Sequence, residues 1–273
     1  MKLGRSLAVI GVGNMASAII AGISSANIDV SDIILYDKNT SQYDKLKSCG
    51  IPTAYASSVY EAVASADCIL LSVKPQNYDE VLKEIADISD HNKKLYISIG
   101  AGITSDSVST RLGGACVVRV LPNVPMLIGK GVSVICRNNA ASKADFDFVC
   151  SVFSSAGSVL LIDECEMNRI IGVTSSSPAY VFKFINAIYK GALSQGLDDK
   201  ALLDAVCDTV IGSALMLKGS SDTPEELISK VASKGGTTEQ ALLTLDHFDF
   251  DRIIEDAMKA CTARADELGA SKK

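Results

Sequence analysis

The first 163 residues of the chain alternate short apolar runs with amphipathic segments. Runs rich in β-branched and aliphatic residues predict seven strands, over residues 7–10, 33–36, 69–73, 95–99, 117–120, 132–136 and 159–162. Apolar residues at helical spacing predict helices between the early strands, over residues 15–25, 44–49 and 78–88. Such alternation is typical of right-handed crossover units, so we expect a mainly parallel sheet. The strands beyond Pro122 and Gly131 have no clear helices between them, so we expect the far end of the sheet to be mixed.

The pattern changes at Glu164, after which β-rich runs disappear and helical spacing alone remains. Residues suited to starting helices stand at Ser177, which proline follows, at Asp198, and at Thr223, which begins a capping box. We expect helices over residues 177–195, 200–217 and 250–268 and a further one after Thr223, with Gly196 ending the first. The chain is therefore expected to have two domains, an α/β domain over residues 1–163 and an all-α domain over residues 164–273. A helical domain of this size has a thin core, so we expect its apolar face to be buried against a second subunit.

Composition narrows the class of protein. Of the 273 residues 48% are hydrophobic and 21% are charged, which suits a chain that buries a core. A formal net charge of −6 argues against general binding to nucleic acid. The first residues lack a secretory signal pattern, and no uncharged apolar run reaches the roughly 18–20 residues of a membrane span, so we expect a cytoplasmic protein. The 8 cysteines are scattered without a C-x-x-C pair and there are 2 histidines, so we expect reduced thiols and neither a metal site nor a histidine-based nucleophile.

A glycine-rich turn follows the first predicted strand, in the sequence Gly11-Val12-Gly13-Asn14-Met15-Ala16. In this G-x-G-x-x-A pattern the first glycine permits a tight turn, the second lets a pyrophosphate approach the main chain, and the alanine allows close helix packing. The free N–H groups of the following helix would bind the anion.

Asp37 directly follows the next predicted strand, where a carboxylate can accept a hydrogen bond from a ribose 2′-OH and repel a 2′-phosphate. Asp37 therefore favours NADH slightly. Lys38 beside it could offset that repulsion, and Asp37 could instead be a solvated acid at a strand end.

Three later strands also end in segments suited to a ligand, at the edge where parallel sheets bind them. These segments are Val73-Lys74-Pro75, Ser98-Ile99-Gly100-Ala101-Gly102 and Arg119-Val120-Leu121-Pro122-Asn123-Val124-Pro125. The small residues of the second allow a flat ring to approach the main chain, and the prolines of the third stiffen its turn. Each motif alone is also compatible with a surface turn.

Taken in order, these motifs resemble those of the pyrroline-5-carboxylate reductase family. Two segments outside the dinucleotide-binding pattern strengthen the resemblance, Ser176-Ser177-Pro178-Ala179-Tyr180-Val181-Phe182 and Ser233-Lys234-Gly235-Gly236-Thr237-Thr238. The similarity runs over nearly the whole chain. The chain departs from the family at Leu121, where methionine is usual, at Ser175, where glycine is common, and at Lys234, where proline is usual.

The resemblance implies a Rossmann-type dinucleotide-binding domain followed by a helical domain for dimerisation and substrate binding. In this family a hydride passes from NADH or NADPH to the C=N bond of L-1-pyrroline-5-carboxylate and gives L-proline, the final step of proline biosynthesis. This chemistry needs positioning of the small-molecule substrate rather than a metal or a strong acid. The resemblance also implies a homodimer through the C-terminal helices, with dimers able to assemble further.

The resemblance further implies which residues form the site. Thr238 is expected to be catalytic, because its hydroxyl can hydrogen-bond the ring nitrogen and relay a proton. The expected substrate-binding residues are Ser233, Gly235, Gly236, Thr237 and Thr238. The expected cofactor-binding residues are Gly11, Gly13, Asn14, Met15, Asp37, Lys38, Val73, Lys74, Pro75, Ala101, Gly102 and Asn123. Two glycines before a helix also suit a carboxylate site, although either threonine could merely cap that helix.

Two other functions stay open. The first is a dehydrogenase of the same architecture that acts on a β-hydroxy acid or another cyclic imine. Such an enzyme would use a lysine in the first helix after the dinucleotide-binding domain, where Lys183 is present without the surrounding motif. The second is a non-catalytic dinucleotide sensor, against which the substrate loop at 233–238 argues. The acidic segment at 246–251 most simply supplies loop and helix-cap residues.

Overall fold

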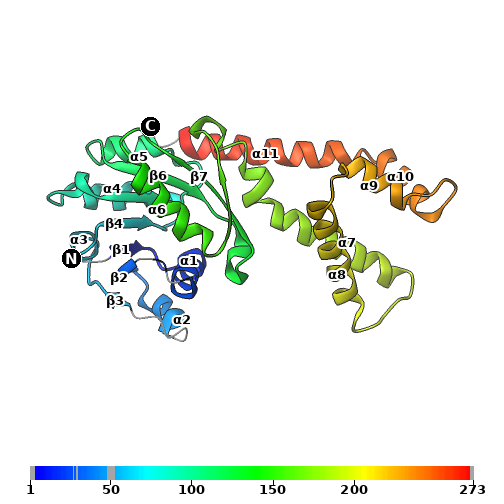
Figure 1. Cartoon of the computed structure of the whole chain (residues 1–273), viewed down its shortest axis with the longest axis horizontal. Helices are drawn as coiled ribbons and strands as arrows, with labels where there is room; N and C mark the ends of the chain where they lie inside the picture. The colour runs from blue at the N-terminus through cyan, green and yellow to red at the C-terminus, as the bar shows by residue number, and fades with distance from the viewer. Residues whose placement is uncertain (1–3, 27, 29, 48–52, 271–273) are drawn as a thin grey trace. The chain divides into compact units, whose positions relative to one another are not determined.

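The computed structural model describes residues 4–26, 28, 30–47 and 53–270, which form two compact units. The first unit contains the chain up to Ser176 and again from Met258 on, and the second contains Ser177–Ala257. Figure 1 shows the first unit built around a sheet and the second built of helices. The domain boundary predicted between residues 163 and 164 stays a prediction, because contacts alone do not define a domain.

In the described residues, the first unit contains an eight-stranded sheet in the order β3-β2-β1-β4-β5-β6-β7-β8. The strands are β1 Arg5–Ile10, β2 Val30–Tyr36, β3 Ala54–Tyr55, β4 Cys68–Leu71, β5 Leu95–Ser98, β6 Cys116–Leu121, β7 Gly131–Arg137 and β8 Gly157–Leu161. Neighbouring strands are parallel except β6 and β7, which are antiparallel. The predicted strands and the mixed far end of the sheet are therefore confirmed. The sequence pattern does not predict β3, which has two residues, both exposed.

Helices connect most of these strands. Those of the first unit are α1 Asn14–Ser25, α2 Asp44–Lys47, α3 Val59–Ala64, α4 Tyr78–Ala86, α5 Ser105–Arg111 and α6 Lys143–Ser154. The three predicted helices correspond to α1, α2 and α4, and residues 48 and 49 of the second prediction lie outside the described residues. The expectation that no helix separates the later strands is wrong. α6 crosses from β7 to β8, which makes that pair parallel, and it begins with a capping box between Ser142 and Asp145.

The sheet has a hydrophobic core on each face. Leu7 and Val9 of β1 pack with residues of α1 and α6, whereas Ala8 and Ile10 pack with residues of α3 and α4. Successive residues of a strand point to opposite faces, so helices on both sides of the sheet bury every side chain in this part of β1. This two-sided burial explains why the strands are continuous apolar runs rather than alternating ones.

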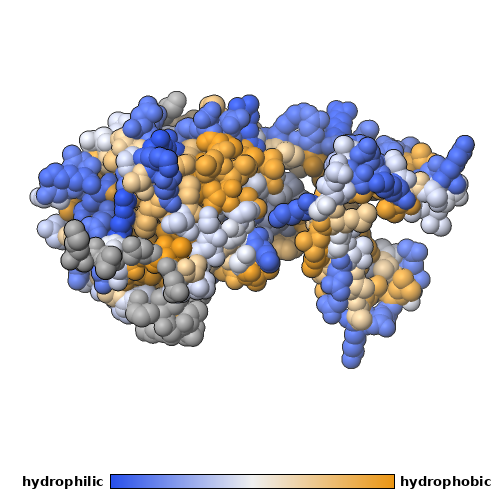
Figure 2. All heavy atoms as spheres, in the orientation of Figure 1, coloured by the Kyte–Doolittle hydropathy of each residue, from blue (hydrophilic) through white to orange (hydrophobic). Residues whose placement is uncertain are grey.

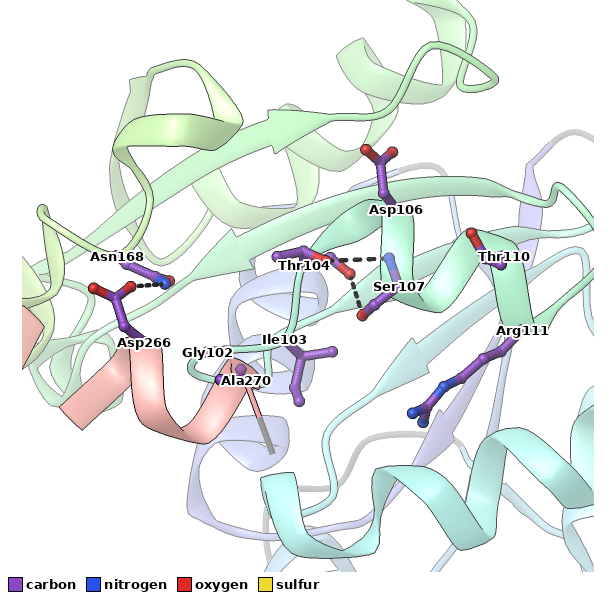
Figure 3. Close-up of a pocket in the computed structure, with 11 residues that line it drawn as sticks. Gly102, Ile103, Thr104, Asp106, Ser107, Thr110, Arg111, Asn168, Asp266 and Ala270 are labelled. Carbon is purple, nitrogen blue, oxygen red and sulfur yellow. Dashed lines mark hydrogen bonds between the residues drawn. The ribbon is translucent and has the colours of Figure 1, made fainter. Parts of the chain in front are cut away.

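The end of α11 Phe250–Ala270 belongs to the first unit, where it packs against the loop that follows β5. Gly102 in this loop has φ +76°, and a Cβ built on it would lie 2.7 Å from the carbonyl oxygen of Ala265. Asp266 Oδ1 accepts a hydrogen bond from Asn168 Nδ2 at 2.7 Å (Figure 3). The last turns of α11 therefore pack against the loop after β5.

Arg119 on β6 is a charged residue in the interior, with 1% of its surface exposed. Its Nη1 donates to Glu164 Oε1 at 2.6 Å, and its Nη2 donates to Asn168 Oδ1 at 2.9 Å. The Glu164 carboxylate also accepts hydrogen bonds from Ser105 Oγ at 2.6 Å and from Cys136 Sγ at 3.1 Å. A buried charge is stable only when it is paired, so these contacts hold the segment after β8 against the sheet.

The second unit consists of α7 Ser177–Ser194, α8 Leu202–Gly219, α9 Pro224–Val231, α10 Thr237–His247 and the first part of α11. Gly196, with φ +85°, follows α7, and the capping box that begins at Thr223 is present at the start of α9. The predicted cap at Asp198 is wrong. The N-cap of α8 is Ala201, whose N–H donates to Asp199 Oδ1 at 2.7 Å.

Many apolar side chains of this unit are exposed. Within the described chain, α7, α9 and α10 contain no buried residue, and α8 contains one, Val206. Phe182, Ile211 and Leu215 are 61%, 56% and 63% exposed, and Figure 2 shows apolar side chains at the surface of these helices. A helical layer with so little core needs a covering surface. None of the helices in the described part of the chain combines the length and the apolar character that crossing a membrane requires.

Candidate functional site

The turn between β1 and α1 fits a phosphate group. Gly11 has φ +93°, and a Cβ there would lie 2.8 Å from the carbonyl oxygen of Ser72, so this position requires glycine. A Cβ on Gly13 would meet nothing within 4 Å, so the main chain there faces open space. Gly13 is the N-cap of α1 without a side-chain cap, and the first turn has no acidic residue. A helix start of this kind is suited to bind an anion.

A cavity of about 590 Å³ opens beside this turn, at the carboxyl ends of β1, β2 and β4. β1 lies between β2 and β4, so the strand order reverses here, which is where open α/β sheets bind ligands. The predicted cofactor residues that line the cavity are Gly11, Gly13, Asn14, Asp37, Lys38, Val73 and Lys74. Residues that sequence reasoning missed include Asn39, Gln42, Asn77 and Glu80. These four residues belong to no recurring motif. The only signal in the sequence is that they are polar and lie close to the motifs.

Asp37 is held in place by the main chain. Its Oδ2 accepts a hydrogen bond from Val12 N at 2.6 Å, and its Oδ1 accepts one from Asn39 N at 2.8 Å. Its own N–H donates to the hydroxyl of Tyr43 at 2.8 Å. Asp37 therefore fixes the glycine turn against the end of β2, and each carboxylate oxygen keeps a second lone pair for a ligand hydroxyl.

Two lysines bring positive charge to the cavity. Lys38 Nζ lies 2.7 Å from Glu80 Oε1 on α4, and both side chains are largely exposed. The hydrogen bond to Glu80 raises the pKa of Lys38, so this lysine carries its charge at neutral pH. Lys74 forms no ion pair with any residue that the structure describes. Among the described residues that line the cavity, Lys38 is in an ion pair and Lys74 is not.

The other predicted cofactor residues, which do not line this cavity, are Met15, Pro75, Ala101, Gly102 and Asn123. Asn123 is buried and its amide joins two main-chain groups. Its Nδ2 donates to Thr174 O at 3.0 Å, and its Oδ1 accepts from Val132 N at 2.8 Å. Any contact of these five residues with a cofactor stays a prediction.

Gly102 lines a different cavity of about 620 Å³, between the start of α5 and the end of α11 (Figure 3). Several polar side chains that line this cavity form hydrogen bonds with neighbouring protein groups. Thr104 Oγ1 accepts from Ser107 N at 3.1 Å, and Asn168 donates to Asp266. These contacts stabilise the local structure, and Gly102 is the predicted cofactor residue that lines this cavity.

The predicted substrate loop forms a tight turn before α10 in the second unit. Gly235 has φ +75°, which favours glycine, and Gly236 N donates to Ser233 O at 2.9 Å. Gly236 is the N-cap of α10. This is the predicted arrangement of a glycine loop that leads into a helix.

The two threonines of this loop do not cap the helix. The N-cap of α10 is Gly236, which has no side chain, so neither Thr237 nor Thr238 holds the capping position. Glu239 Oε2 accepts from Gly235 N at 2.7 Å, which lies outside the helix. Glu239 places a carboxylate in the first turn of α10, and the role of this loop toward a substrate stays a prediction.

Two family models match the chain. One described as pyrroline-5-carboxylate reductase dimerisation matches residues 164–268, and one described as NADP oxidoreductase coenzyme F420-dependent matches residues 6–102.

Curated relatives match over nearly their full length. The chain is 32% identical to the pyrroline-5-carboxylate reductase of Haemophilus influenzae over 270 residues, covering 97% of each chain. It is 32% identical to that of Escherichia coli over 273 residues, covering 98% of this chain and 99% of the relative.

Two solved structures are similar as well. The pyrroline carboxylate reductase of Plasmodium falciparum, with NADP bound, has a TM-score of 0.86 and 27% identity, covering 98% of this chain and all of the other. The 1-pyrroline-5-carboxylate reductase of Streptococcus pyogenes has a TM-score of 0.88 and 28% identity, covering 97% of this chain and 99% of the other.

Proposed function

The chain belongs to the pyrroline-5-carboxylate reductase family, and we propose that it reduces L-1-pyrroline-5-carboxylate to L-proline with NAD(P)H. The observation that carries this proposal is the full-length similarity to enzymes of that name, which includes the helical part as well as the dinucleotide-binding part. A protein that shared only the cofactor fold would lack the loop before α10.

The first unit is suited to hold the cofactor. The start of α1 and the bare main chain at Gly13 would bind the pyrophosphate. Asp37, fixed by Val12 and Asn39, would accept a hydrogen bond from a ribose hydroxyl. When bound, NAD(P)H supplies the hydride that adds to the imine carbon.

The loop before α10 is suited to hold the substrate. The start of α10 and the two glycines would bind the substrate carboxylate, as the start of a helix binds anions. The hydroxyl of Thr238 would hydrogen-bond the ring nitrogen, which gains a proton as the imine carbon gains the hydride. The reaction then turns the C=N bond into CH–NH and leaves the substrate carboxylate unchanged.

The helical unit supports a homo-oligomer, as the dimerisation family model indicates. The finer proposal is a dimer in which α7 to α11 of two subunits cover one another's apolar side chains. Exposed residues such as Phe182, Ile211 and Leu215 favour this interface. Light scattering would test it, because Leu215→Asp should lower the measured mass. Unchanged mass for that variant would contradict this choice of interface.

A panel of substrates tests the proposed function. Oxidation of NADH and NADPH is followed at the nicotinamide absorbance band with pyrroline-5-carboxylate, with β-hydroxy acids and the oxidised cofactors in parallel. We expect turnover with the imine alone. Turnover with a β-hydroxy acid would favour the alternative dehydrogenase, and binding of cofactor without any turnover would favour the sensor.

A further inference from the structure

We propose that Glu80 makes this enzyme prefer NAD(H) over NADP(H), by holding Lys38 and placing a negative charge at the 2′-phosphate position. This inference rests on the proposed function only for the identity of the cofactor class. The two residues lie 42 positions apart in the sequence, form a hydrogen bond and both line the cavity beside the glycine turn.

The position follows from the fold. A carboxylate at the end of the second strand of such a sheet marks the adenosine ribose, and a cation close to it is what accommodates a 2′-phosphate. Asp37 occupies the first place and Lys38 directly follows it. Lys38, Asn39 and Glu80 all line this part of the cavity. A change in the charge or the pairing of Lys38 therefore acts at the ribose 2′ position, where NAD and NADP differ.

The charges at this position do not favour a phosphate. Lys38 Nζ is 2.7 Å from Glu80 Oε1, and Glu84 on the same helix adds a second negative charge in the neighbourhood of Lys38. Asp37 contributes a third carboxylate. A phosphate monoester carries about −1.5 to −2 charges at pH 7, so it would have to displace Glu80 from Lys38 and stay close to the displaced carboxylate. A ribose hydroxyl meets no such penalty.

Lys74 does not replace Lys38 as the cation close to the ribose 2′ position. Lys74 lies in the segment after β4, whereas Asp37 and Lys38 follow β2, on the opposite side of β1. The charge of Lys74 bears on the cavity in general, so it adds to the binding of both cofactors through the pyrophosphate they share. The difference between them then depends on the pair formed by Lys38 and Glu80.

Calorimetric titration with NAD⁺ and NADP⁺, without imine, tests the proposal apart from turnover. The wild-type protein should bind NAD⁺ more tightly. Glu80→Gln should shift the ratio of the two dissociation constants toward NADP⁺ by about fivefold, a rough size for the loss of an exposed charge pair. The shift should shrink at high salt, because these side chains are exposed.

Two further variants separate the local pair from general charge. Glu84→Gln removes the same charge from the same helix without touching the cavity, and should change the ratio less than twofold, a rough limit for a screened surface charge. In a Lys38→Met background, Glu80→Gln should give a smaller shift than it gives alone. A wild-type preference for NADP⁺, an unchanged ratio in Glu80→Gln, or an equal shift in Glu84→Gln would overturn the proposal. A full shift in the Lys38→Met background would overturn the part assigned to Lys38.

The same titrations distinguish this proposal from the proposed function. Tight, discriminating binding by a protein that does not oxidise cofactor with the imine would refute the reductase activity and leave the assignment of Glu80 standing. Imine-dependent oxidation with no change of cofactor ratio in Glu80→Gln would refute the assignment of Glu80 alone. Binding of neither nucleotide would refute both.

Discussion

Gly102 and Gly269 pack main chain against main chain. A Cβ built on Gly269 would lie 2.7 Å from the carbonyl oxygen of Gly102, and one built on Gly102 would lie 3.3 Å from Gly269 N. The last turn of α11 is thereby joined to the loop after β5, whose residues Ala101 and Gly102 are predicted to contact the cofactor.

Gly269→Ala should destabilise the protein for this reason. Alanine in a helix is ordinarily better than glycine by about 1 kcal/mol, but here overpacking against a carbonyl group costs about 1–3 kcal/mol. We expect a lower free energy of unfolding in urea. Gly191→Ala on α7 is the matched control, because its Cβ would meet nothing within 4 Å and should not destabilise. Equal stability of the Gly269→Ala protein and the wild type would contradict the close packing.

Glu164→Gln should destabilise the protein through Arg119. The variant keeps the size of the side chain but leaves the buried guanidinium without its negative partner, which costs about 2–4 kcal/mol. Denaturant unfolding measures this change. Asp147→Asn breaks the exposed pair with Lys143 and should cost less than about 0.5 kcal/mol. Similar losses in the two variants would show that Arg119 does not depend on Glu164.

Asp145→Asn should give a stability difference that depends on pH. Burial raises the pKa of Asp145, but hydrogen bonds from Ser142 and Arg5 outweigh it, so the pKa in the folded state lies below the ordinary value. A lowered folded pKa contributes stability above the unfolded pKa that is lost as the pH falls through the folded one. We expect the wild type to be more stable by about 1 kcal/mol at pH 7.

Urea unfolding of wild type and Asp145→Asn at neutral and acid pH checks this sign. The difference should shrink as the carboxyl group becomes protonated. A difference that grew toward acid pH would mean that the folded state raises the pKa of Asp145 instead.

The sequence predicts much of this fold because the strands are continuous apolar runs. It does not predict α6, because Asp145, Phe146, Asp147 and Phe148 alternate acidic with aromatic residues and hide the helical spacing of its buried residues. The capping box at Ser142 is the signal that could have found it. Short elements such as β3 have too few residues for a periodic pattern to appear.

The residues of the candidate site also differ in whether the sequence alone identifies them. Gly11, Gly13 and Asp37 belong to a pattern of fixed spacing, so the sequence alone identifies them. Glu80 is one acidic residue among several on an amphipathic helix, and its partner Lys38 lies in another crossover unit. Only the packed fold brings the two together, so no local pattern could reveal that pair.

Thr238→Ala should lower kcat by about 100-fold, because it removes a hydrogen bond to the atom that gains a proton. The KM for the imine should change less than kcat. Thr244→Ala on the same helix is the matched control, because the Thr244 hydroxyl donates to the main-chain oxygen of Gln240 within α10. Steady-state kinetics and thermal unfolding measure the two effects separately. Full activity of Thr238→Ala would remove this residue from the mechanism.

The most direct measurement is the amount of L-proline formed for each nicotinamide oxidised by the wild-type protein. The account predicts equal amounts, no oxidation without pyrroline-5-carboxylate, and no proline without the reduced cofactor. Oxidation that proceeded without proline, or no oxidation by a protein that binds the cofactor, would contradict it.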